Sequence, residues 1–150
     1  GVDRVVWVTD GLKNDHTDGH IDTLARFVAP GRVLVMRPSG PDDPNREALS
    51  RIIDELSGQR DARGRALELV TLPSPGRVES SGVVMPASYV NYYVGNSTVV
   101  VPTYGVESDE NAVECIARWF PGRRVVGRSA LSSFVGFGPF HCITQQVPKA

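Results

Sequence analysis

Residues 25–36 read ARFVAPGRVLVM, two apolar runs on either side of Pro30-Gly31. Proline fixes φ and glycine permits a positive φ, so this pair is typical of a tight turn. We therefore predict a hairpin whose first strand covers His20 to Phe27 and whose second strand covers Arg32 to Met36.

The residues that follow predict a helix and then a third strand. Between residues 42 and 57, apolar side chains recur at steps of three and four, which is the period of a helix with one buried face. Asp42 or Asp43 could cap this helix, with Pro44 in its first turn. A polar run then leads to residues 66–70, which alternate like a strand.

The same order of elements recurs with an offset of 66 positions. Residues 88–94 and 98–101 resemble a second hairpin, residues 108–120 a helix, and residues 124–126 a strand. We interpret this as an internal repeat with units at roughly 20–72 and 88–128. The alternative is that any two α/β units share such a pattern. Two units of this size do not close a ring, so the chain is expected to need neighbours.

Composition excludes several classes of function. The chain has 150 residues, of which 41% are hydrophobic and 22% charged, and its net charge is −1. These values are typical of one ordinary globular domain and provide no basic surface for nucleic acid. No apolar stretch is long enough to cross a bilayer and no signal layout opens the chain, so we expect a cytoplasmic protein. The start at Gly1 leaves room for an upstream segment.

The densest polar cluster covers residues 14–22, with sequence NDHTDGHID, just before the first predicted strand. If His20 and Asp22 begin that strand, their spacing points both side chains to one face. The carboxylate would attract a cation, and the imidazole could exchange protons near neutral pH. An exposed polar turn is the alternative interpretation.

A metal site is a weaker interpretation of the same cluster. His16, Asp18, His20 and Asp22 are all possible ligands. Elsewhere in the sequence, however, there is no pair of Cys or His residues at the spacing typical of zinc motifs. We therefore expect no metal.

Cys142 follows a glycine-rich run near the end of the chain, and a short β-like stretch comes after it. Gly136 and Gly138 would let the backbone approach a ligand closely, and a nearby donor would favour the thiolate. The alternative is a small buried side chain, to which we assign Cys115 on the second predicted helix. A dinucleotide-binding loop at residues 136–138 is rejected because the next glycine is missing and no helix opens there.

Several separated segments together resemble successive motifs of the agmatine deiminase and peptidylarginine deiminase family. The resemblance covers nearly the whole chain, in the family's order, and identifies it as a C-terminal half. It implies an α/β fold, part of a pentein propeller in which five strand-strand-helix-strand units surround a central site. The segments are residues 15–22, 25–28, 86–91, 100–102 and 141–146.

The resemblance also implies a reaction. The cysteine matching Cys142 attacks a guanidinium carbon, the histidine matching His20 protonates the leaving ammonia and then activates water, and the acid matching Asp22 holds the guanidinium. Gly136 and Gly138 would line the substrate site. The expected reaction converts agmatine to N-carbamoylputrescine and ammonia without a metal or organic cofactor.

Two departures from the family pattern affect these expectations. Phe137 and Pro139 stand where the family has a glycine and a small polar residue. They could reshape the wall of the pocket, so the resemblance does not fix the identity of the substrate. The family's first half also carries a further guanidinium-binding acid and an acidic partner for the histidine. We therefore expect the chain to need an N-terminal half, from the same enzyme or another subunit, and homo-oligomers are a further option. An amidinotransferase and a non-catalytic guanidino-binding or assembly module are the alternatives.

Overall fold

The computed structural model describes residues 2–16, 19–133 and 138–147. The chain divides into two compact units, Gly1–Val90 and Asn91–Ala150. No helix among these described residues is both long and apolar enough to span a membrane.

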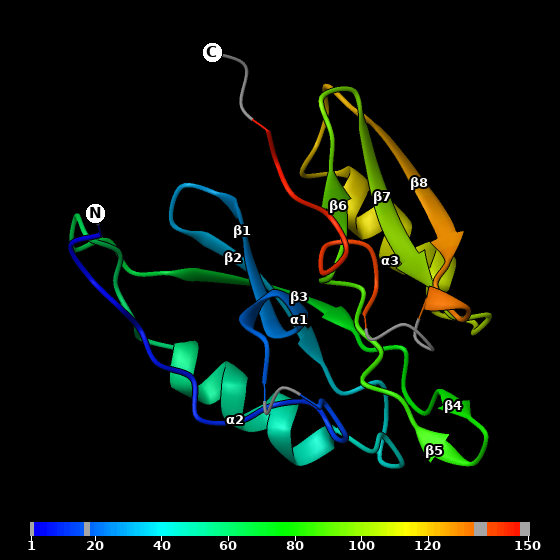
Figure 1. Cartoon of the computed structure of the whole chain (residues 1–150). Coiled ribbons are helices and arrows are strands. Elements are labelled where there is room, and N and C mark those ends of the chain that lie inside the picture. The colour runs from blue at the N-terminus through cyan, green and yellow to red at the C-terminus, as the bar shows by residue number, and fades with distance from the viewer. Residues whose placement is uncertain (1, 17–18, 134–137, 148–150) are drawn as a thin grey trace. The chain divides into compact units, whose positions relative to one another are not determined.

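The first unit is built on a three-stranded sheet with the order β1-β2-β3 (Figure 1). β1 runs antiparallel to β2, as the predicted hairpin requires, and β2 runs parallel to β3. Its elements are α1 (Ile21–Leu24), β1 (Ala25–Ala29), β2 (Arg32–Arg37), α2 (Arg46–Leu56), β3 (Glu68–Pro73), β4 (Glu79–Ser80) and β5 (Val83–Val84). The last two strands form a separate small hairpin.

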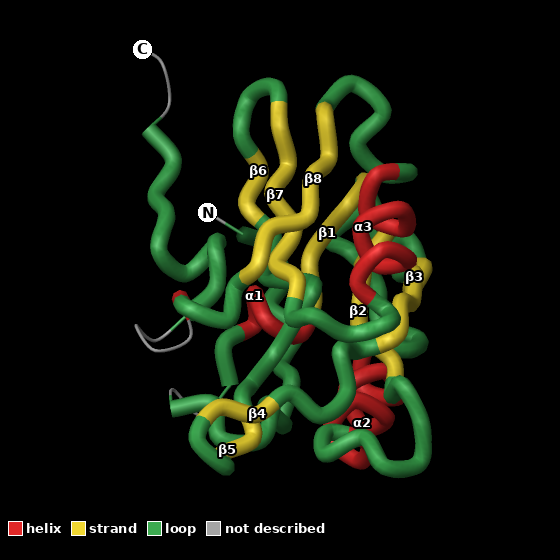
Figure 2. The backbone as a smooth tube through the Cα atoms, turned by 90° about the vertical axis from the view of Figure 1, so that its right-hand side faces the viewer, coloured by secondary structure: helices red, strands yellow, loops and turns green. Residues whose placement is uncertain are grey.

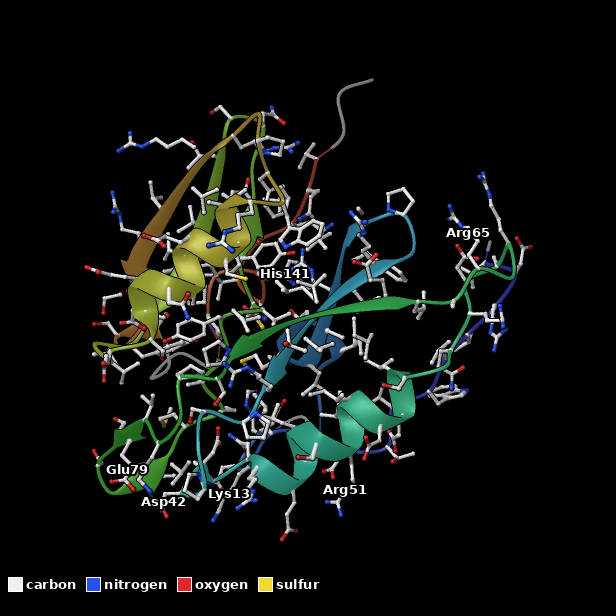
Figure 3. The ribbon with its side chains drawn as sticks, turned by 180° about the vertical axis from the view of Figure 1, so that it is seen from behind. Lys13, Asp42, Arg51, Arg65, Glu79 and His141 are labelled. Atoms are coloured by element: carbon white, nitrogen blue, oxygen red, sulfur yellow. The ribbon has the colours of Figure 1, made fainter. Side chains whose placement is uncertain are left out.

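Helix α2 forms the parallel crossover between β2 and β3 and closes the core of this unit. Its residues Leu49 and Ile52 are buried, as the helical period predicts, together with Leu34 and Met36 of β2. The opposite face is polar: Arg51 projects outward from α2 (Figure 3) and its Nε donates to Asp10 at 2.7 Å. The helix therefore secures the N-terminal segment on one face and the sheet on the other.

Two predictions for the first unit are wrong in their boundaries. The strand expected from His20 starts only at Ala25, because residues 21–24 form the short helix α1. The helix expected from residue 42 begins at Arg46, with Asn45 at its N-cap, so Pro44 precedes the helix. Residues 5–8, whose apolar pattern resembles a strand, also lie outside the named strands of the described chain.

Asp43 organises the turn before α2 instead of capping it. Its carboxylate accepts hydrogen bonds from the backbone of Ser39 at 2.9 Å and of Asn45 at 2.8 Å, and from the hydroxyls of Ser39 and Ser74. Burial acts to raise the pKa of Asp43, but these hydrogen bonds, led by that of Ser74, outweigh burial and hold the pKa below its usual value.

The second unit repeats this order of elements with β6 (Tyr93–Val94), β7 (Thr98–Thr103), α3 (Asp109–Ala117) and β8 (Arg124–Ser129) (Figure 2). β6 is antiparallel to β7, and β7 is parallel to β8. Asp109, 66 positions after Asp43, likewise accepts backbone hydrogen bonds from the turn before its helix, including one from Gly105 at 2.7 Å.

The first strand of the second unit is much shorter than predicted. Residues 88–92 are fully buried, which explains their apolar pattern, but only Tyr93 and Val94 pair with β7. The chain is a mixed α/β protein, as predicted, and the sheets of its described residues are small.

Candidate functional site

His20 lies at the N-cap of α1, and its side chain is exposed. Its backbone N–H donates to Oδ2 of Asp15 at 3.1 Å. Its carbonyl accepts from the backbone N–H of Thr23 at 3.0 Å and from the Thr23 hydroxyl at 2.7 Å. The imidazole is therefore carried on a short turn whose backbone is bonded on both sides.

Asp22 lies in the first turn of α1 and is half-buried. The premise that His20 and Asp22 share one face of a strand is wrong, because the bonds from Thr23 close a helical turn at this point. Successive side chains on a helix are rotated by about 100°, so strand alternation does not apply. The two predicted residues nevertheless remain neighbours on one turn of the first unit.

His16, another possible ligand in the metal interpretation, lies near His20. Its ring lies edge-on to that of His20, with centroids 6.4 Å apart and an interplanar angle of 81°. Asp18, the other extra ligand of that interpretation, lies outside the described residues.

Cys142 lies in a turn of the second unit, and its side chain is exposed. The side-chain amide of Asn91 donates to its Sγ at 3.1 Å. A hydrogen bond donated to sulfur stabilises negative charge there and fixes the direction of the side chain. The thiol is therefore both reachable and oriented.

Asn91 is a site residue to which sequence reasoning assigned no role. It is fully buried, and its Oδ1 accepts from the backbone N–H groups of His141 at 3.0 Å and Cys142 at 3.4 Å. Its backbone carbonyl also accepts from His141 at 3.3 Å. The signal in the sequence was a polar residue within the largely apolar run 87–92, which is buried, so that its amide needs partners. His141 itself is half-buried and labelled in Figure 3.

Gly138 packs closely against the side chain of Cys142. A Cβ at this position would lie 2.6 Å from Cβ and 3.2 Å from Sγ of Cys142. A side chain at this position would therefore collide with the cysteine, whereas the close approach of this backbone to a ligand stays a prediction. Gly136, the other glycine predicted to line the site, lies outside the described residues.

Cys115 differs from Cys142 in its surroundings. It is half-buried on α3, and burial raises the pKa of its thiol, with Arg118 acting weakly in the opposite direction. A raised pKa keeps the sulfur protonated and reduces its nucleophilicity near neutral pH.

The first unit also has a large apolar groove of about 780 Å³, which reaches α1 through Ile21. Residues 2–8, β1 and residues 60–67 contribute to its lining. Neither His20 nor Asp22 is among the described residues that line it. The polar cluster, rather than this groove, is the candidate site of the first unit.

Comparisons with known proteins support the family resemblance. The family model described as Porphyromonas-type peptidyl-arginine deiminase matches residues 1–148. A Legionella pneumophila (strain Paris) protein named "Putative agmatine deiminase" is 40% identical over 151 residues, which are 100% of this chain and 44% of that protein. A Marinomonas protein of the same name is 36% identical over 165 residues, covering 99% of this chain and 45% of its own length.

Solved structures agree with the sequence matches. Agmatine deiminase of Enterococcus faecalis superposes with a TM-score of 0.88 and 33% identity, over 97% of this chain and 44% of that one. A C. jejuni agmatine deiminase with substrate bound gives a TM-score of 0.80 and 26% identity, over 93% and 40% of the two chains. The chain therefore spans less than half the length of the relatives it matches.

Proposed function

Because the chain belongs to the Porphyromonas-type peptidyl-arginine deiminase family, we propose that it forms part of a hydrolase that deiminates a guanidino compound. The substrate proposed is agmatine, and the products are N-carbamoylputrescine and ammonia. The names of the relatives support agmatine over other guanidino compounds. The observation that carries the proposal is the exposed Cys142 thiol with an amide donor 3.1 Å from its sulfur.

Cys142 is the nucleophile of the proposed reaction. Its thiolate adds to the guanidinium carbon, and the C–N bond to the leaving nitrogen breaks as His20 protonates that nitrogen to ammonia. The product of this half-reaction is an amidino-cysteine. His20 then takes a proton from water, the resulting hydroxide adds to the same carbon, and the C–S bond breaks. This step releases the ureido product and restores the thiolate.

Asn91 serves this chemistry by holding the sulfur in place. Its amide N–H bonds to Sγ while its oxygen bonds to the backbone of the same turn, so one buried side chain fixes the nucleophile and its peptide together. Such a donor also stabilises the thiolate that leaves the substrate in the second half-reaction.

Asp22 is proposed to hold the guanidinium. A carboxylate accepts paired, charge-assisted hydrogen bonds from the planar group and so orients its carbon toward the sulfur. Gly136 and Gly138 are proposed to line the substrate site, and the crowding at Gly138 supports a backbone wall beside the nucleophile. In this scheme Cys142, His20 and Asp22 act on one substrate, without a metal or organic cofactor.

The remaining parts of the enzyme are proposed to come from an N-terminal half, in the same polypeptide or in another subunit. The length of the matched relatives supports this proposal, since the chain covers 44% of the Legionella protein. The complete fold would be the five-unit pentein propeller, and the repeated pairing of strands in the two described units is consistent with it.

Ammonia release from agmatine tests the proposal. We would assay this chain alone, with its N-terminal half, and with that half plus Cys142→Ala. Cys115→Ala is the matched control, because it removes the other thiol. We expect ammonia only when both halves and Cys142 are present, and full activity from the control.

Other outcomes would overturn the agmatine assignment. Loss of guanidino substrate without ammonia, when an acceptor amine is supplied, would indicate an amidinotransferase. Binding of agmatine without turnover by the reconstituted wild type would indicate a non-catalytic module.

A further inference from the structure

The backbone of His20 is bonded on both sides by buried side chains. Asp15 is 9% exposed and accepts the His20 N–H through its carboxylate. Thr23 is 4% exposed and donates its hydroxyl to the His20 carbonyl. The imidazole between them is exposed, so its direction depends strongly on the peptide that carries it.

Both bonding partners are themselves fixed. The backbone N–H of Asp15 donates to the carbonyl of the buried Leu12 at 3.0 Å. Lys13, in the same turn, donates its N–H to Oδ1 of the buried Asn45 at 2.7 Å. The acid therefore lies on a turn that is held to the segment before α2.

Thr23 is fixed from the opposite direction. The hydroxyl of Ser88, which is fully buried, donates to the Thr23 carbonyl at 2.6 Å and accepts from the backbone N–H of Val90 at 3.1 Å. The turn that carries His20 is thereby bonded to a second, distant segment of the same unit.

The residue before His20 makes such fixing necessary. Gly19 has a φ of +115°, in a region that other residues rarely adopt, and glycine loses more conformational freedom than any other residue when it is fixed. Its close neighbours are backbone atoms, since a Cβ added at Gly19 would lie 3.4 Å from Cα of Gly11. Without the Asp15 bond, the N–H of the peptide between Gly19 and His20 would lose this side-chain acceptor.

We infer that Asp15 and Thr23 are positioning residues that aim the His20 imidazole by fixing its peptide on both sides. The inference rests on the proposed function, in which His20 transfers protons. Proton transfer depends on heavy-atom distances within hydrogen-bond reach, and a misplacement of about 1 Å can lower the rate by about a hundredfold. Neither residue needs to touch the substrate.

Substitutions at Thr23 test the hydroxyl with little change of shape. In the enzyme assembled with its N-terminal half, Thr23→Val keeps the branched side chain but removes the donor. We expect kcat to fall about tenfold, as for the loss of one hydrogen bond that places a catalytic group. Thr23→Ser restores the donor and should bring kcat back to within about threefold of wild type.

Asp15 is tested in the same way. Asp15→Ala removes the acceptor and should lower kcat. Asp15→Asn keeps an oxygen acceptor and should therefore retain most of the wild-type kcat. Ser74→Ala is the matched control for stability. It also removes a buried hydroxyl of this unit, but that hydroxyl donates to Asp43 and makes no hydrogen bond to the described residues of the turn that carries His20. It should lower the unfolding midpoint and leave kcat unchanged.

A readout independent of turnover separates this inference from the proposed function. Hydrogen exchange of the His20 amide should be at least about tenfold faster in Asp15→Ala than in wild type, but unchanged in Ser74→Ala. If the wild type releases no ammonia, the proposed function fails while the exchange rates still test the fixing of the peptide. Unchanged exchange in Asp15→Ala, or no rescue of kcat by Thr23→Ser in an active enzyme, would overturn the inference.

Discussion

At the scale of single residues, the candidate nucleophile depends on one buried amide. The side-chain nitrogen of Asn91 donates a hydrogen bond to the sulfur of Cys142, and its side-chain oxygen accepts from the peptide N–H groups of the same turn. The sequence placed this asparagine in a motif but could not assign the contact, because 50 residues separate it from His141. Only the folded chain brings the two segments of this unit together.

Replacing Asn91 should therefore slow the chemistry of Cys142. In Asn91→Ala the sulfur loses a donor and the backbone N–H of His141 loses one of its two acceptors, so we expect alkylation of Cys142 by iodoacetamide to slow about tenfold. The rate would be followed by peptide mass spectrometry, with Cys115 as an internal reference.

The exposed Asn96 supplies the control for this experiment. Asn96→Ala should leave the alkylation rate of Cys142 unchanged. Equal rates in wild type and Asn91→Ala would contradict the role assigned to the amide.

Gly138 offers a second test at the residue scale. The added methyl group of Gly138→Ala would meet Cβ of Cys142 at 2.6 Å, so the turn has to shift and the nucleophile moves with it. We expect kcat for ammonia release to fall about tenfold or more.

Gly122→Ala is the matched control, because a Cβ there has no neighbour within 4 Å. It should keep wild-type kcat. A Gly138→Ala enzyme with normal kcat would show that the turn tolerates the added group.

At the scale of elements, the periodicity of the sequence predicts the central strands better than the segments that lead into the first strand of each unit. Residues 32–36 and 98–101 were predicted as strands and lie within β2 and β7. Their apolar side chains are the signal, because paired strands in a sheet bury such side chains in the core. The strand predicted from His20 was wrong over residues 20–24, where the side chain and backbone of Thr23 close a helical turn. Periodicity carries no information on such local bonds.

The turn before α2 provides a prediction on stability. Asp43 is buried and accepts several hydrogen bonds, so we expect Asp43→Ala to lower the free energy of unfolding by about 1–3 kcal/mol at pH 7. Because the folded-state pKa of Asp43 is lowered, its stabilising effect is fully present above the unfolded pKa of about 3.9 and is lost as the pH falls through the folded pKa.

Urea unfolding between pH 7 and acid pH would measure this effect. The difference between wild type and Asp43→Ala should shrink on acidification below about pH 4. Asp42→Ala removes the exposed neighbouring acid, which is labelled in Figure 3. It should lower the free energy of unfolding far less than Asp43→Ala does. A constant difference across the range would argue against an ionised Asp43 as the source of stability.

At the scale of the whole molecule, the chain is short relative to its family. It covers 44% of the Legionella relative and of the Enterococcus faecalis structure, and it carries two sheets with the same order of strand pairing. In the proposed function, turnover depends on an N-terminal half in addition to this chain. Homo-oligomers remain a separate proposal from the missing half.

Dilution measures how tightly a separate N-terminal half would associate with this chain. If the two halves are separate chains, specific activity in ammonia release should fall on dilution below their dissociation constant and recover when the N-terminal half is added in excess. A genetic fusion of the halves is the control and should keep its specific activity. Dilution-independent activity of the unfused pair would indicate an association too tight for this range.

The mixed α/β class, the order of elements and the family followed from the sequence, because apolar periodicity and short motifs are local properties of the chain. The sequence also singled out Cys142, His20 and Asp22 as candidates through those motifs. Only the tertiary structure showed how buried Asn91 holds the cysteine turn and how Asp15 and Thr23 hold the His20 peptide. The Asn91 contacts join segments far apart in the chain, and those at His20 depend on the local turn that replaces a strand, so neither could be derived from periodicity.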